Sequence, residues 1–461
     1  MNQQLKKETQ NIPEKSKKVD FAERLGFGLG DLAVNFTWAS LGMFVVYFYT
    51  DVIGLGAGIV GTIMLTSRFL DGISDVTMGI IVDKTKSKHG KARSWVLWMA
   101  IPFALFTVLL FTVPDISYTG KVIYVFISYN VLVLAFTAIV IPYGTLNSLI
   151  TQDQHEREVL NIYRTFFAQI GVLIVTNLTM PMVGWFGGEQ FGWIITYSIF
   201  GIAATIFFFI TFKTTTERVQ PVDKSSTKIS IKDSLKTLIE NKYWIMVFLF
   251  FIIYSMGQGL HQASTIYYAE YILGNTWLVG PLNLAHILPV VIGFLVLSKI
   301  FDKFGKRNSM IWGAIISVIG LLITLIEPSS LLIVTLSQII KGLGLVPLLG
   351  GLFALLPDTI EYGEWKTGIR NEGVLYSGGS MGQKIGIGIG SASVGWILSL
   401  GGYIGGQAVQ SESAITAIYT IFIYLPMAIF IAQIILLYFY KLDKEYPQIV
   451  NDLKLRKLEK Q

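Results

Sequence analysis

Two aspartates and an arginine share one face of an apolar segment near residue 70. Arg68, Asp71 and Asp75 are spaced i, i+3 and i+7, which places them on one side of an α-helix. Two carboxylates this close repel each other in a low-dielectric environment, which favours a shared proton or a bound cation. Their four oxygens suit a hard cation such as sodium, and Ser74 or Thr137 could add a hydroxyl ligand. The spacing therefore predicts a cation site; the alternative is an ion-pair cluster with Arg68 that only locks the helix.

Two lysines also lie inside apolar segments, where a charge at the bilayer centre costs at least ~3 kcal/mol. Lys384 lies in the glycine-rich stretch 378–390, which predicts close helix contact and a helix that moves or unwinds, unless the glycines serve ordinary packing alone. We expect Lys384 and Arg68 to balance the two aspartates, so that the cation-free site is near neutral. Lys341 either binds an acidic group or pairs internally.

A further polar group, Asp31, Asn35 and Trp38, has the helical spacings i, i+4 and i+7. Polar groups beside an aromatic ring suit a sugar, because its hydroxyls need hydrogen bonds and its apolar ring face stacks on the indole. Gln258 and His261, on a later apolar segment, are a candidate second wall of such a site. Each of them could equally form an interhelical hydrogen bond.

These residues lie in a chain dominated by apolar side chains. Of its 461 residues, 52% are hydrophobic and 14% are charged, and there is no cysteine. Soluble domains carry about 25% charged residues, so the composition predicts a polytopic membrane protein whose surroundings are the lipid bilayer. The lack of cysteine excludes disulfides and thiolate metal sites.

Twelve apolar segments are long enough to cross a bilayer, which takes roughly 20 residues. They are residues 25–50, 57–83, 94–113, 120–150, 160–185, 191–213, 243–272, 281–301, 308–326, 330–357, 371–401 and 415–440. All lysines and arginines except Arg68, Lys121, Lys341 and Lys384 fall in segments that lie on one side of the membrane if there are twelve spans. By the positive-inside rule, we predict an all-α protein of the cell membrane with both termini in the cytoplasm. This bias also explains the net charge of +6, so nucleic-acid binding is not expected.

A polar loop of about thirty residues divides the chain into two six-helix halves. We predict a cytoplasmic tail at 1–22, a helical bundle at 23–213, a cytoplasmic loop at 214–242, a second bundle at 243–440 and a cytoplasmic tail at 441–461. A repeated pattern supports duplication: VDK at 82–84 is followed by GKAR at 90–93, and FDK at 301–303 is followed by GKR at 305–307. Both follow the second helix of their half, as in the organisation of major facilitator transporters.

Several stretches between residues 20 and 440 resemble the glycoside–pentoside–hexuronide:cation symporter family. They are YTDVIGL at 49–55, RFLDGISD at 68–75, IPY at 141–143 and DTIEYGEWK at 358–366. The resemblance implies that Asp71 and Asp75 hold the coupling cation beside Thr137, and that Lys384 lies between the cation and sugar sites. It assigns Arg68 to the same motif as the aspartates.

The sugar positions differ from those of a galactoside-transporting member of the family. Asn35 and Val140 stand where that member has two aspartates. Without those carboxylates the site lacks charge-assisted hydrogen bonds, which are about twice as strong as neutral ones. The site therefore suits either a neutral pentoside such as a xyloside, held by Asn35 and Trp38, or a glucuronide drawn by Lys341. We favour the xyloside, because Lys341 could equally pair with a neighbouring carboxylate.

Together the residues predict a secondary active transporter that couples sodium or proton flow to uptake of a glycoside, pentoside or hexuronide. We expect no cofactor besides the coupling ion, and a monomer. The alternative is a symporter of a lysolipid or another organic solute. An enzyme is not expected, because no loop is long enough for a catalytic domain and the four histidines lack metal-site spacing. A sensor would leave the two carboxylates without a role.

Overall fold

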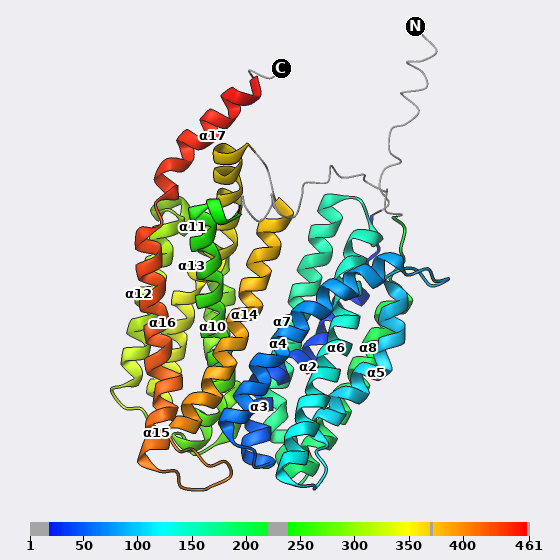
Figure 1. The fold of residues 1–461 in the computed structure, drawn as a ribbon, viewed down its shortest axis with the longest axis vertical. Coiled ribbons are helices and arrows are strands. Elements are labelled where there is room, and N and C mark those ends of the chain that lie inside the picture. Colours follow the sequence, from blue (N-terminus) through cyan, green and yellow to red (C-terminus); the bar gives the residue numbers. More distant parts are fainter. Residues whose placement is uncertain (1–17, 220–237, 369–371, 459–461) are drawn as a thin grey trace.

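The computed structural model describes residues 18–219, 238–368 and 372–458, and these are helical with no strand. The first half contains α2 (Phe21–Met43), α3 (Val45–Tyr47), the π-helix η2 (Phe48–Val52), α4 (Ala57–Lys84), α5 (Arg93–Phe111), α6 (Tyr118–Ile150), α7 (Gln154–Trp185) and α8 (Glu189–Thr214). The second half contains α10 (Lys242–Tyr271), η3 (Thr276–Leu278), α11 (Val279–Phe304), α12 (Lys306–Thr324), α13 (Leu331–Thr367), α14 (Glu372–Leu400), α15 (Glu412–Tyr419), the π-helix η4 (Thr420–Tyr424) and α16 (Leu425–Phe439). The two halves lie side by side in Figure 1.

Most of these helices can cross a membrane. Within the described ranges, nine are long and apolar enough, and α2 with its continuation through η2, bent by 53°, makes a tenth. α4 and α14 have 28 and 29 residues but are less apolar, since α4 carries five charged residues and α14 is rich in glycine. Each of the twelve predicted segments overlaps one of these elements, and the predicted all-α fold is confirmed.

The helices within each half pack closely. In the first half α2 packs against α7 and α8, and α5 against α6 and α8. In the second half α10 packs against α14 and α16, and α13 against α11 and α12. Between the halves, the main contact joins α4 to α14 (Figure 1). The two helices that carry the predicted cation-site charges therefore form the main interface between the halves.

The halves meet tightly at the end of the bundle where α2 ends and α4 begins, which is the predicted extracellular end. A methyl group added at Gly61 of α4 would lie 2.7 Å from the carbonyl oxygen of Ala392 of α14, so the helix backbones touch here. At the same end Asp51 accepts hydrogen bonds from the hydroxyls of Tyr271 (2.7 Å) and Tyr403 (2.5 Å). The Gly61 contact and the Asp51 bonds close this end of the bundle.

The predicted C-terminal tail contains a further helix, α17 (Leu442–Leu458), at the upper end of the view in Figure 1. Trp365 at the end of α13 donates its indole N–H to Asp452 (3.0 Å) and accepts a hydrogen bond from Arg456 at its carbonyl oxygen (2.7 Å). Tyr243 donates to Glu445 (2.8 Å). The tail is thus anchored to the second half. Most of the predicted N-terminal tail (1–17) and of the predicted loop (220–237) lies outside the described residues.

Candidate functional site

The predicted face of α4 carries a compact cluster of polar side chains. Arg68 Nη1 lies 3.6 Å from Asp71 Oδ2. Thr137 of α6 places its hydroxyl 3.4 Å from Asp71 Oδ1 and 3.2 Å from Asp75 Oδ1, and Ser74 donates to the same hydroxyl (3.1 Å). Asp71 is only 3% exposed. The structure therefore brings together every residue that the sequence assigned to the cation site.

Lys384 completes this cluster from the other half of the molecule. Its ammonium forms ion pairs with Asp75 and with Asp71, the latter over 3.4 Å. The ammonium thus lies where a cation held by both carboxylates would lie. The two negative charges of the aspartates are balanced by the positive charges of Arg68 and Lys384. The ion pairs of Lys384 connect α14 directly to α4.

Arg68 also touches the predicted sugar site. Its guanidinium carbon lies 5.2 Å from the ring centroid of Trp38, within the range of a cation–π interaction. Trp38 in turn stacks on Phe136, with centroids 4.7 Å apart and planes inclined by 24°. The aromatic surface predicted for a sugar and the carboxylates predicted for a cation are therefore joined by one side chain.

The other two residues of the predicted sugar group are held by local contacts. Asp31 accepts a hydrogen bond from Arg164 of α7 (2.8 Å), and the guanidinium of Arg164 lies 5.1 Å from the ring centroid of Tyr143. Asn35 donates its amide to the carbonyl oxygen of Asp31 (2.8 Å). The charge pattern places Arg164 with the basic residues of the cytoplasmic side, although it lies within the predicted span 160–185. In the structure it neutralises Asp31 between α2 and α7.

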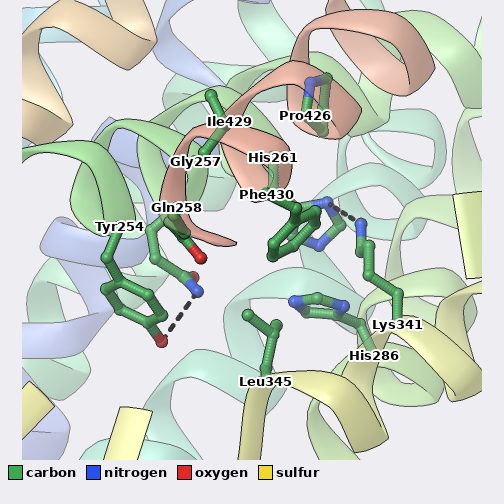
Figure 2. A pocket seen from close by; sticks show the side chains of 11 residues that line it. Tyr254, Gly257, Gln258, His261, His286, Lys341, Leu345, Pro426, Ile429 and Phe430 are labelled. Atoms are coloured by element: carbon green, nitrogen blue, oxygen red, sulfur yellow. Dashed lines mark hydrogen bonds between the residues drawn. The ribbon is translucent and has the colours of Figure 1, made fainter. Parts of the chain in front are cut away.

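Gln258, His261 and Lys341 lie together in the second half, around a cavity that Asp31, Asn35 and Trp38 do not line (Figure 2). Lys341 Nζ lies 3.2 Å from His261 Nδ1, so among the described residues this lysine contacts another basic side chain and not a carboxylate. Gln258 donates to the hydroxyl of Tyr254 (3.1 Å). A substrate-binding role for these three residues stays a prediction.

Within the described ranges, no group of three or more histidine, aspartate or glutamate side chains is placed to hold a metal ion. The cation cluster offers two carboxylates and two hydroxyls instead. Such oxygen atoms are the ligands that hard cations prefer.

Comparison with known proteins identifies the family. A family model described as MFS/sugar transport protein matches residues 26–444. The chain belongs to this family. It is 36% identical over 445 residues to the isoprimeverose transporter of Lactiplantibacillus pentosus, covering 95% of this chain and 92% of that protein. It is 31% identical over 439 residues to the glucuronide carrier protein homolog of Escherichia coli, covering 94% of this chain and 95% of that protein.

A solved structure supports the same fold. A bacterial homolog of the human lysosomal transporter Spinster, in an inward-facing and unoccupied conformation, aligns with a TM-score of 0.66 at 14% identity, over 93% of this chain and 97% of that one. The family match and the relatives show that the chain is a multi-pass membrane transporter and not an enzyme, and the solved structure shows the major facilitator fold. The predicted membership of the glycoside–pentoside–hexuronide:cation symporters is confirmed.

Proposed function

We propose that this chain couples inward sodium flow to uptake of a neutral xyloside such as isoprimeverose, a disaccharide of xylose and glucose. The observation that carries the proposal is the cluster in which Lys384 of one half neutralises Asp71 and Asp75 of the other. The hydroxyl of Thr137, within 3.4 Å of both carboxylates, supports sodium over a proton. A proton would need only the two carboxylates.

Sodium binding would displace the Lys384 ammonium from Asp71 and Asp75. This exchange breaks ion pairs between α4 and α14 at the middle of the interface, so it biases the equilibrium between the two access states of the rocking halves. A neutral cluster becomes singly positive when sodium enters. Moving that charge inward across the membrane then yields about 2.3 kcal/mol per 100 mV of membrane potential.

Sugar and sodium would stabilise each other through Arg68. A sugar ring resting on Trp38 changes the surroundings of the guanidinium, which lies between Trp38 and Asp71. Any such coupling is reciprocal, so sodium must raise sugar affinity by the same factor by which sugar raises sodium affinity. Reciprocal coupling of this kind favours the state in which sugar and sodium are bound together, and this state is the one that a symporter carries across the membrane.

Two features support a neutral sugar. Asp31, the acidic residue beside Asn35, is already paired with Arg164. Lys341, the residue that would draw a glucuronide, contacts His261 in a separate cavity. One relative is named an isoprimeverose transporter, and isoprimeverose contains a xylose unit.

Sugar counterflow in proteoliposomes tests the substrate class. Vesicles holding the purified chain and an unlabelled sugar are diluted into labelled isoprimeverose, and the panel includes a methyl xyloside, a glucoside, a galactoside and a glucuronide. We expect isoprimeverose and the xyloside to drive counterflow most strongly. Trp38→Leu should reduce it, and Trp98→Leu, whose side chain on α5 is 47% exposed, should not. Counterflow with glucuronides but not xylosides would refute the proposal, and lysophospholipid uptake without any sugar counterflow would favour a lipid cargo.

A further inference from the structure

A small cavity lies inside the second half, between α10, α11, α13 and α16 (Figure 2). Its volume is about 20 Å³. One water molecule needs roughly 10–15 Å³ measured in this way, so the cavity holds an occupant of one or two waters in size and not a sugar. Its polar lining residues are Tyr254, Gln258, His261, His286, Lys341 and Gln433.

Three basic side chains from three helices meet at this cavity. Lys341 of α13 is 3% exposed, His261 of α10 is 7% exposed and His286 of α11 is 4% exposed. The two imidazole rings have their centroids 4.0 Å apart, and Lys341 Nζ lies 3.2 Å from His261 Nδ1. Within the described ranges no carboxylate lies within 4 Å of Lys341 Nζ, so its charge has no acidic partner there. A buried charge without a counter-charge costs several kcal/mol.

The hydrogen-bond directions show what the cavity lacks. A lysine ammonium can only donate, so His261 accepts at Nδ1 and carries its own proton on Nε2. That Nε2 and the Nδ1 of His286 have no partner among the described residues. The amide oxygen of Gln433, a lining residue 1% exposed, also has none; exchanging the oxygen and nitrogen of this amide would place a donor there instead. The cavity therefore faces the Lys341 ammonium and the unpartnered N–H of His261, two donors that require an acceptor, and an unpartnered nitrogen of His286.

Other occupants fit this lining poorly. A metal cation would meet the charge of Lys341 and find no carboxylate ligand. Water would satisfy some donors but would leave the charge unbalanced. The ring of Phe422, whose centroid lies 5.7 Å from Lys341 Nζ, offers only the weak attraction of a π face.

We propose that this cavity binds a small monovalent anion, for which chloride is the natural probe, with Lys341, His261 and His286 as its donors. The anion would supply the missing negative charge and join α10, α11 and α13 through one shared contact. None of its lining residues belongs to the cation cluster of Asp71, Asp75 and Lys384, so the inference does not depend on the proposed sugar transport.

Thermal unfolding of the purified full chain tests the proposal. The melting temperature is measured in sodium chloride and in sodium gluconate at equal sodium concentration, without sugar, because gluconate is too large for the cavity. At about ten times the dissociation constant we expect chloride to raise the melting temperature by about 1–3 °C, in a saturable way, and bromide to act similarly. Lys341→Met and His286→Phe should abolish this shift. Lys121→Met, which removes a lysine paired with Asp115 at a helix end (3.3 Å), should retain it.

A second measurement avoids dependence on the stability of variants. Anomalous scattering from wild-type crystals soaked in bromide should give a peak between Lys341 and His286. Equal melting temperatures in chloride and gluconate, absence of the bromide peak, or a chloride shift that persists in Lys341→Met would overturn the proposal. Stabilisation by glucuronate and not by chloride, lost in Lys341→Met, would assign the basic cluster to a substrate carboxylate and would also overturn it.

Discussion

Replacing Lys384 by glutamine should tighten sodium binding while uncoupling it from sugar uptake. In the structure the Lys384 ammonium is paired with Asp71 and Asp75, the two carboxylates that would bind sodium, so sodium must displace it. The Lys384–Asp71 pair at 3.4 Å corresponds to about 5 kcal/mol of Coulomb attraction at an effective dielectric constant of 20. The lysine side chain is 31% exposed, so hydration of the separated charges compensates for much of this attraction when the pair breaks. We therefore expect removal of the lysine to make the free energy of sodium binding more favourable by about 1–3 kcal/mol, which is roughly a 5- to 150-fold increase in sodium affinity.

Sodium titration of the purified variant measures this effect. The dissociation constant is obtained by calorimetry or from the melting temperature in buffers where choline replaces sodium. Lys121→Gln serves as the matched control, because its partner Asp115 is fully exposed and such surface pairs contribute about 0–1 kcal/mol. Its sodium affinity should stay close to that of the wild type. Unchanged or weaker sodium binding in Lys384→Gln would refute the idea that lysine and sodium compete for the same carboxylates.

Three further predictions follow from the contacts around the interface. Thr137→Val removes the hydroxyl shared by the two carboxylates and should weaken sodium binding about tenfold in the same titration; unchanged affinity would exclude it as a ligand. Asp51→Asn should weaken the closed end of the bundle and speed thiol labelling of a cysteine placed at the buried Ala57, in a chain with no cysteine of its own; equal labelling rates would show that Asp51 does not hold that end closed. Gly61→Val should lower the melting temperature by several degrees because its Cβ would lie 2.7 Å from a backbone oxygen of α14, whereas Gly72→Val, with open space around Gly72, should not; equal effects of the two variants would contradict the tight contact.

Local geometry explains why much of the site could be predicted. Helical spacing alone places Arg68, Asp71 and Asp75 on one face, and the cost of a charge in the membrane indicates that Lys384 needs a partner. Because two aspartates face one arginine on α4, the charge count predicts that Lys384 pairs with these aspartates. The structure contains the ion pairs of Lys384 with Asp71 and Asp75. Hydrophobic segments of the required length similarly predict the helices, although tertiary contacts determine where each one ends.

Contacts between distant segments could not be derived in this way. Lys341 and His261 are 80 residues apart and Arg164 and Asp31 are 133 apart, so no helical period relates either pair. The charge pattern assigns Arg164 to the basic cytoplasmic end, because it lies only ten residues into α7. The mostly polar helix α17 has little apolar periodicity of its own and is held by individual hydrogen bonds such as Trp365–Asp452.

Uptake of labelled isoprimeverose into proteoliposomes under an inward sodium gradient tests the central claim most directly. The wild-type chain should accumulate the sugar above its external concentration and lose it when the gradient is dissipated. Asp75→Asn should exchange the sugar across the membrane without accumulating it, because one of the two cation-binding carboxylates is gone. Equal accumulation when choline replaces sodium, or full sodium-driven accumulation in Asp75→Asn, would contradict sodium coupling through this cluster.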